Sequence, residues 1–161
     1  MTFVDPKTYY QNLPQKRMAV AALFFNEQGQ VLVLKTSYKK HWTLPGGVVE
    51  HNESLSLALV REVKEETGLA VINYKLAVLD YCAPKIVNEV QNTESLQILF
   101  DCGVLDKTAE SSIKIDHDEI VEYKFCSSAE ALKILGIPLR RRLSSYLEVK
   151  RAVYLENGLS I

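Results

Sequence analysis

Residues 46–54 read Gly-Gly-Val-Val-Glu-His-Asn-Glu-Ser, and residues 61–69 read Arg-Glu-Val-Lys-Glu-Glu-Thr-Gly-Leu, with an apolar segment between them. The glycine pair interrupts regular structure and allows a close approach of the backbone. Ser54 suits the N-cap of a helix, and Gly68 suits the position just after its last turn. These residues therefore predict a glycine turn followed by one helix of about 13 residues.

Three glutamates share one face of this predicted helix. Glu62, Glu65 and Glu66 follow the i, i+3 and i+4 spacing that brings helical side chains together. Leu55 and Leu59 fall on nearly the same side one or two turns earlier, so the acidic cluster continues a stripe that we expect to be buried. Crowded carboxylates repel one another unless a cation neutralises them, and oxygen ligands of high charge suit Mg²⁺ or Mn²⁺. The cluster thus predicts a divalent metal site; the alternative interpretation is a solvated, charged helix end.

The spacing of the fixed residues also resembles a known family. Gly47, five residues, Glu53, seven residues and then the segment 61–69 resemble a complete Nudix box, in which every fixed position is filled. A pattern with this many fixed positions is far more specific than a lone glycine motif. The preceding segment 42–46, Trp-Thr-Leu-Pro-Gly, and the length of the chain also resemble the family.

The resemblance implies a metal site and supporting residues. The ligands of the metal would be the side chains of Glu62, Glu65 and Glu66 and the backbone carbonyl of Gly46. Glu53 is expected to begin the helix and to pair with Arg61 or to help position water. Arg61 is expected to form an ion pair that orients the glutamates, since metal sites need such support around their ligands.

The base that activates water is less directly indicated. It could be a box glutamate, with Glu65 the catalytic candidate. Family members often place a further carboxylate far downstream of the box, and we favour Glu119 because it stands at the start of a predicted strand. The other candidates in this region are Glu122, Asp116, Asp118 and, more weakly, His117.

The function implied by the resemblance is divalent-metal-dependent hydrolysis of a nucleoside diphosphate linked to another moiety. ADP-ribose or a nucleotide sugar is slightly favoured, because Pro84 lies fifteen positions beyond the box, as in ADP-ribose hydrolases of the family; Pro84 is equally well explained as the end of a strand. One alternative is a nucleoside triphosphate pyrophosphohydrolase that acts on oxidised or non-standard nucleotides. An alternative of another class is a non-catalytic sensor domain that binds nucleotides.

Composition supports one soluble domain and excludes several partner classes. The chain has 161 residues, a net charge of −1 and 47% hydrophobic residues, so we expect an arm over residues 1–16 and a single domain over 17–161. The balanced charge argues against nucleic acid, and no apolar run of membrane-spanning length or signal peptide is present. The three cysteines have no zinc spacing and indicate buried thiols in a reducing cytoplasm. The family resemblance leaves a homodimer open.

Alternating strands and helices indicate the α/β class. The resemblance sharpens this class to an α/β/α sandwich with a mixed central sheet. Adjacent Arg140, Arg141 and Arg142 are expected to be mostly solvated around the last helix. Besides the box helix, strands are expected over 17–25, 31–35, 71–81, 95–105 and 119–126, loops over 84–93 and 106–118, and helices over 128–135 and 138–152.

Overall fold

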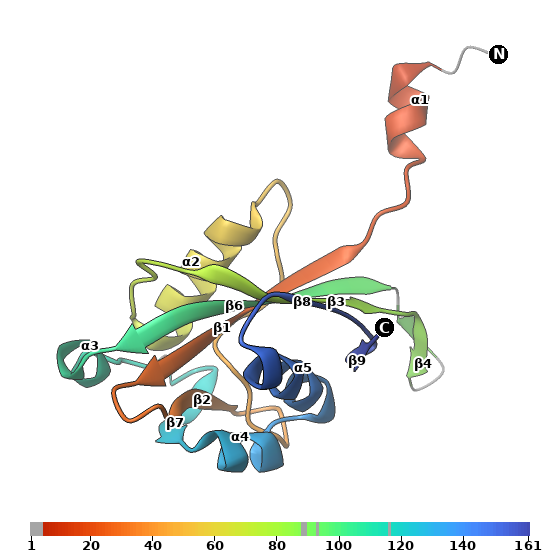
Figure 1. Cartoon of the computed structure of the whole chain (residues 1–161). Helices are drawn as coiled ribbons and strands as arrows, with labels where there is room; N and C mark the ends of the chain where they lie inside the picture. Colours follow the sequence, from red (N-terminus) through yellow and green to blue (C-terminus); the bar gives the residue numbers. More distant parts are fainter. Residues whose placement is uncertain (1–4, 88–89, 93, 116) are drawn as a thin grey trace.

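The computed structural model describes residues 5–87, 90–92, 94–115 and 117–161. Within these residues, seven strands form one sheet: β1 (Arg17–Asn26), β2 (Val31–Thr36), β3 (Lys75–Cys82), β6 (Ser95–Leu105), β7 (Ile120–Cys126), β8 (Val153–Glu156) and β9 (Leu159–Ser160). Their order across the sheet is β7-β2-β1-β6-β3-β8-β9 (Figure 1). β1 pairs in parallel with β6, and β3 with β8, whereas the other neighbours are antiparallel. The expected mixed sheet is therefore confirmed.

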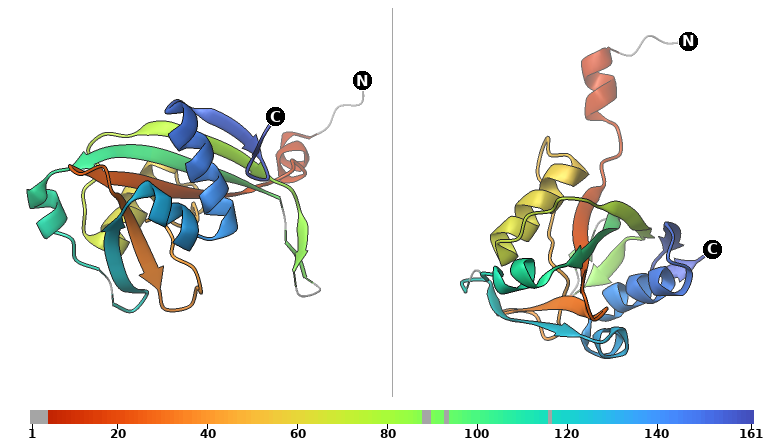
Figure 2. Two further views of the ribbon diagram at one scale, coloured as in Figure 1. Left: turned by 60° about the horizontal axis from the view of Figure 1, so that its bottom comes forward. Right: turned by 60° about the vertical axis from the view of Figure 1, so that its left-hand side comes forward.

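Helices cover both faces of the sheet, as the two turned views in Figure 2 show. Side chains of β1 alternate between two cores, because successive residues of a strand point to opposite faces. Val20 and Phe24 pack with the helix α2 (Leu55–Thr67), whereas Leu23 packs with residues of α4 (Ser128–Ile134) and α5 (Ile137–Val149). This arrangement is the α/β/α sandwich that the family resemblance implies.

The helix α2 has the predicted length and the predicted ends. The Ser54 hydroxyl accepts a hydrogen bond from the Leu57 amide at 3.2 Å, and Gly68 adopts a φ of 71° while its amide donates to the Lys64 carbonyl. Both caps satisfy backbone groups that a helix end otherwise leaves without partners. Glu53, expected to begin the helix, instead lies one residue before the cap.

Several expectations for the downstream half were wrong. The predicted loop over 84–93 contains a two-stranded hairpin, β4 (Lys85–Val87) and β5 (Val90–Asn92), and the predicted loop over 106–118 contains the short helix α3 (Lys107–Ser111). β3 begins at Lys75, not at residue 71, and the hairpin β8–β9 was missed. Only Cys126 of the three cysteines is fully buried; Cys82 and Cys102 are half-buried.

Arg142 corrects the expectation that the three adjacent arginines are solvated. Its side chain is only 8% exposed, and its Nε donates to Asp80 Oδ2 at 2.6 Å. Asp80, on β3, is fully buried, and its other carboxylate oxygen accepts from the Gly158 amide at 2.9 Å. This contact joins α5 to the turn between β8 and β9.

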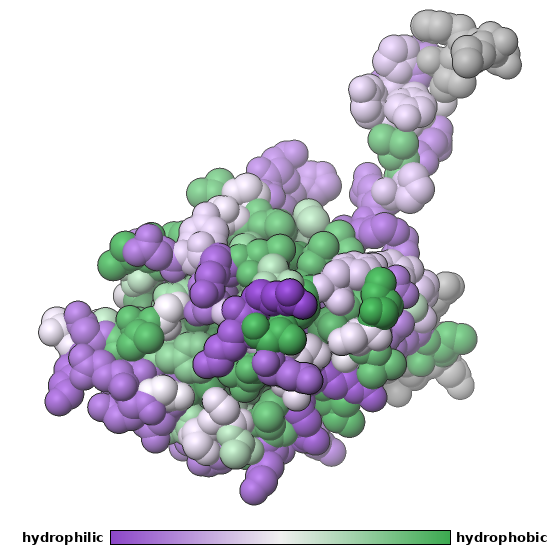
Figure 3. All heavy atoms as spheres, in the orientation of Figure 1, coloured by the Kyte–Doolittle hydropathy of each residue, from purple (hydrophilic) through white to green (hydrophobic). Residues whose placement is uncertain are grey.

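The short helix α1 (Pro6–Gln11) stands away from the body of the molecule in Figures 1 and 2, and none of its residues is buried. The space-filling view in Figure 3 shows it as a projection from a face on which polar and apolar residues are intermingled. No helix in the described part of the chain is both long and apolar enough to span a membrane.

Candidate metal centre and adjoining cavity

The loop at Gly46 lies against β1, where it takes the place of a neighbouring strand. The Ala22 amide donates to the Pro45 carbonyl at 2.7 Å, and the Val20 amide donates to the Gly47 carbonyl at 2.9 Å. Gly46 has a φ of 139°, and a Cβ added to it would lie 2.2 Å from the Val20 carbonyl oxygen. Only glycine can occupy this position without moving the backbone.

Gly47 makes room for a glutamate of the box helix. A Cβ on Gly47 would lie 2.4 Å from Glu62 Oε1. On the neighbouring residue, the Gly46 amide donates to Glu66 Oε2 at 2.6 Å. The two glycines thus bring the backbone into contact with two carboxylates of α2, as the sequence predicts for a close approach.

Arg61 connects the remaining box residues. Its Nε and Nη2 donate to the two carboxylate oxygens of Glu53 at 2.8 and 2.9 Å, in a bidentate pair. Its Nη1 donates to Glu62 Oε1 at 2.8 Å and to Glu65 Oε2 at 3.3 Å, and its Nη2 also donates to the Val48 carbonyl. These hydrogen bonds lower the pKa of Glu53 to about 2 and raise that of Arg61. The expected pairing of Glu53 with Arg61 is present in the structure.

A carboxylate from outside the box, that of Glu119, acts electrostatically on this cluster. Glu119 directly precedes β7, and its Oε1 accepts a hydrogen bond from the Tyr38 hydroxyl at 2.6 Å. The bond to Glu119 raises the pKa of Tyr38 to about 12, and the charges of Glu66 and Glu62 contribute to this rise. Burial is the main cause of the raised pKa values of Glu62 and Glu66, and the charge of Glu119 adds to both. No motif in the sequence singled out Tyr38, which stands alone in a polar loop.

The box glutamates differ in burial and therefore in how easily they ionise. Glu66 is only 6% exposed; burial raises its pKa to about 8, against the opposing effect of the Gly46 amide. Burial also raises the pKa of Glu62, partly offset by Arg61. The Glu65 side chain is 59% exposed. Thus Glu62 and Glu66 are the more enclosed carboxylates of the box, whereas Glu65 is exposed and contacts Arg61.

The donor chemistry of this cluster fits a hard divalent ion, because it consists of crowded carboxylate oxygens whose repulsion a cation would relieve. Among the described residues, however, no three His, Cys, Asp or Glu side chains stand together in an arrangement that could hold a metal ion. Glu62 is turned to Arg61 and Glu66 to the Gly46 amide. Metal binding therefore requires these two side chains to exchange a protein partner for the ion.

The other candidate bases lie in different surroundings. Glu122 is exposed on β7, opposite Lys35 of β2. His117 and Asp118 lie in the turn before β7. Asp116 lies outside the described residues. Pro84 lies between β3 and β4, where a proline that ends a strand is expected.

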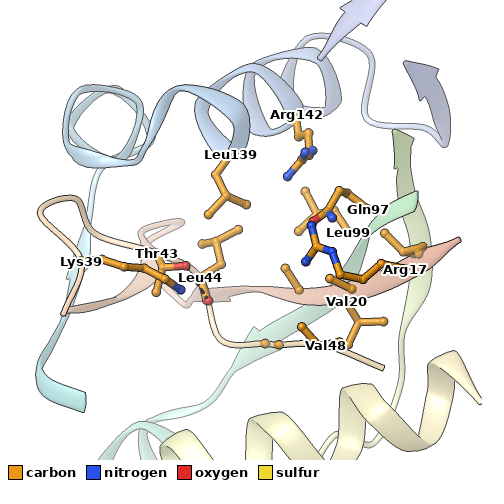
Figure 4. A pocket seen from close by; sticks show the side chains of 15 residues that line it. Arg17, Val20, Lys39, Thr43, Leu44, Val48, Gln97, Leu99, Leu139 and Arg142 are labelled. Atoms are coloured by element: carbon orange, nitrogen blue, oxygen red, sulfur yellow. Dashed lines mark hydrogen bonds between the residues drawn. The ribbon is translucent and has the colours of Figure 1, made fainter. Parts of the chain in front are cut away.

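A cavity of about 230 Å³ adjoins the glycine loop on the side away from α2 (Figure 4). Lys39 and Thr43 line one end of this cavity. The positive charge of Lys39 also acts on Glu66, where it partly offsets the rise in pKa that burial causes. Other lining residues come from the glycine loop, β1, β6 and α5, including Gly46, Gly47, Arg17, Leu99, Leu139 and Arg142. A molecule in this cavity would touch the loop that contacts Glu62 and Glu66.

Comparison with known proteins identifies the family of this arrangement. The family model described as the NUDIX domain matches residues 15–147. The chain belongs to the Nudix hydrolase family. Among solved structures, a MutT protein from Methanosarcina mazei Go1 has a TM-score of 0.69 and 27% sequence identity, and the alignment covers 87% of this Nudix chain and 99% of that one.

Curated relatives carry names from two substrate classes. The Nudix chain is 32% identical over 111 residues to a Danio rerio protein named 8-oxo-dGDP phosphatase. This alignment covers 67% of the Nudix chain and 32% of the Danio rerio protein. It is 30% identical over 105 residues to a Bacillus subtilis protein provisionally named an ADP-ribose pyrophosphatase. This second alignment covers 65% of the Nudix chain and 49% of the Bacillus subtilis protein. The chain thus spans about half or less of the length of these relatives.

Proposed function

We propose that the chain hydrolyses a phosphoanhydride bond of a nucleotide with the help of a divalent cation, Mg²⁺ or Mn²⁺. The observation that carries this proposal is the contact of Glu62 and Glu66 with a glycine loop that also lines a cavity, together with the charge of Glu119 that acts on both carboxylates. Two of these carboxylates come from the box helix, and the third comes from a distant turn. Carboxylates crowded next to a cavity are arranged to hold positive charge against a phosphate chain.

The metal ligands in this proposal are Glu62, Glu65, Glu66 and the carbonyl of Gly46. A divalent cation bound by them supplies charge neutralisation for the phosphates and eases the attack of water. Arg61 keeps the helix carboxylates in place, since it is itself fixed by the bidentate pair with Glu53. Glu53 therefore acts through Arg61.

Glu119 is the proposed general base. Tyr38 donates to Oε1 of Glu119, and among the described residues no hydrogen bond to its Oε2 is present. The free oxygen can accept a proton from an attacking water while the bonded oxygen keeps the carboxylate oriented. Glu65 is the alternative base within the box.

Two substrate classes remain candidates within this reaction. We favour a nucleoside diphosphate linked to another moiety, such as ADP-ribose or a nucleotide sugar, because the cavity beside the loop offers space for a group beyond the phosphates. The relative named 8-oxo-dGDP phosphatase equally supports an oxidised nucleotide as substrate. A sensor that binds nucleotides without turnover is the non-enzymatic alternative.

The test is nucleotide release from a panel of ADP-ribose, nucleotide sugars, dinucleotides and ordinary and oxidised nucleoside triphosphates, with Mg²⁺ and with Mn²⁺. Glu66→Gln and Glu119→Gln are compared with Glu148→Gln, which removes an exposed carboxylate from α5. We expect one substrate class to be cleaved, and both site variants to lose at least about 100-fold in kcat. Full activity of Glu66→Gln would refute the metal site, and binding without turnover by the wild type would support the sensor.

A further inference from the structure

The cavity beside the glycine loop continues into a second one of about 500 Å³. The two share Arg17, Gln97 and Arg142, which therefore stand at their junction. Lys85 and Arg141 line the second cavity. A ligand that begins at the glycine loop and extends along this path must pass the two shared arginines.

The arginines reach the junction from different layers. Arg17 extends from the start of β1 and Arg142 from α5, and Figure 4 shows both guanidinium groups directed into the space between the sheet and the helix. Gln97 of β6 lies beside them, and its amide nitrogen donates to the Ser95 hydroxyl at 3.1 Å. Its amide oxygen is thus the end of the side chain left to face the junction.

The two guanidinium groups have different partners. Arg142 uses Nε for Asp80 and Nη2 for the Cys82 sulfur at 3.3 Å, and no hydrogen bond of its Nη1 occurs among the described residues. The Arg17 side chain has no hydrogen bond or ion pair with any described residue. Asp80 offsets one of the two positive charges, so one charge stays uncompensated at the junction.

No aspartate or glutamate is found among the described residues that line either cavity. In the free protein, water solvates the exposed Arg17. A neutral ligand group that covered Arg17 would remove this water and leave a charge without a partner, which is costly. An anionic group would instead complete the pairing, and guanidinium groups bind phosphate oxygens in a bidentate manner.

We propose that Arg17 and Arg142 bind a phosphate monoester on the ribose of the substrate's nucleoside half, in addition to the phosphates of the anhydride that is cleaved. The inference rests on the proposed function for the direction of the substrate, with the anhydride at the glycine loop. Apolar Val20, Leu44 and Leu139, which line the first cavity, would contact the nucleoside between the two phosphate positions. The preferred substrate class is then a nucleoside diphosphate derivative with a phosphorylated ribose.

The test uses ligands that cannot be hydrolysed at an anhydride. Isothermal titration calorimetry compares nucleoside 5′-monophosphates with the 2′,5′- and 3′,5′-bisphosphates of adenosine, guanosine and uridine. The proteins are the wild type, Arg17→Gln, Arg17→Lys and Arg151→Gln, the last of which removes an exposed arginine that lines neither cavity. Hydrolysis of ADP-ribose and 2′-phospho-ADP-ribose is measured in parallel.

We expect at least one bisphosphate to bind the wild type about 10- to 100-fold more tightly than its monophosphate. Arg17→Gln should lose this preference, Arg17→Lys should keep part of it, and Arg151→Gln should keep all of it. The inference is overturned by equal affinity for both members of every pair, by binding of neither, or by a preference that persists in Arg17→Gln. Bisphosphate binding without any turnover would instead reject the proposed hydrolysis and leave this site intact.

Discussion

Alanine substitution of the two adjacent loop glycines should separate folding from function. In Gly46→Ala, the new Cβ would lie 2.2 Å from the Val20 carbonyl oxygen at a φ of 139°. Relief of this clash requires the loop to leave β1, and Val20 and Ala22 donate the backbone hydrogen bonds that it would strain. Backbone strain of about 1–3 kcal/mol and the weakening of one such bond, about 1 kcal/mol, predict a loss of about 2–4 kcal/mol in the free energy of unfolding.

The neighbouring Gly47→Ala is the matched control. The three atoms nearest to its Cβ would all belong to the carboxylate of Glu62, which is the far end of a flexible side chain. The free energy of unfolding should therefore change by less than about 1 kcal/mol, whereas the displaced carboxylate should lower kcat at least about 10-fold if Glu62 binds the metal.

Urea denaturation and thermal unfolding measure the first effect, and nucleotide hydrolysis measures the second. For a domain of this size, the loss in Gly46→Ala corresponds to a decrease in Tm of roughly 4–15 °C. The reasoning is refuted if Gly46→Ala unfolds like the wild type, or if Gly47→Ala is destabilised as strongly as Gly46→Ala.

Three further predictions concern contacts elsewhere in the fold. The pKa of Glu53 is lowered to about 2 by Arg61, below its ordinary value of about 4.3, so its stabilising contribution is present above pH 4.3 and is lost as the pH falls toward 2; in Arg61→Ala, urea midpoints measured across this interval should fall less steeply. Arg142→Met leaves the buried Asp80 carboxylate without its ion-pair partner and should cost about 3–5 kcal/mol in urea denaturation; a loss below about 1 kcal/mol would contradict this expectation. Burial, with a smaller contribution from a neighbouring carboxylate, raises the pKa of Cys102 to about 12, so iodoacetamide should modify it at pH 8 only after unfolding, as read by peptide mass spectrometry.

The box helix was predictable because its determinants are local. Ser54 and Gly68 cap it within a few residues, and its apolar spacing specifies which side is buried. The hairpin β8–β9 was missed because its stability depends on distant pairing: β8 adds to β3 in parallel, and the Asn157 amide donates to the Tyr81 carbonyl. Four- and two-residue strands carry too little periodicity to be recognised alone.

The same distinction applies to the site. Spacing along one helix predicted that Glu62 and Glu66 would lie together, but it could not distinguish the buried Glu66 from the solvent-facing Glu65, since that difference depends on the loop at Gly46. Glu119 acts on these carboxylates because of long-range structure: the strand that follows it, β7, pairs with β2, and its carboxylate accepts a hydrogen bond from Tyr38, 81 residues earlier in the chain. Long-range pairing of this kind leaves no local signal in the sequence.

We also expect a divalent cation bound at the carboxylates of the box to stabilise the folded protein. Burial and neighbouring carboxylates raise the pKa values of Glu62 and Glu66, so a divalent cation that binds them should stabilise the folded state far more than it stabilises the unfolded chain. At a cation concentration of about 100 times Kd, the gain is about 2.7 kcal/mol, or roughly 5–11 °C in Tm.

Thermal unfolding with Mg²⁺, with Mn²⁺ and with EDTA measures this gain, and matched KCl controls for ionic strength. Gln at position 66 can still accept the hydrogen bond from the Gly46 amide, so Glu66→Gln should fold normally yet lose most of the gain. An increase in Tm of equal size in Glu66→Gln would mean that the cation binds elsewhere. Because this measurement needs no substrate, it tests the metal centre independently of which nucleotide the protein cleaves.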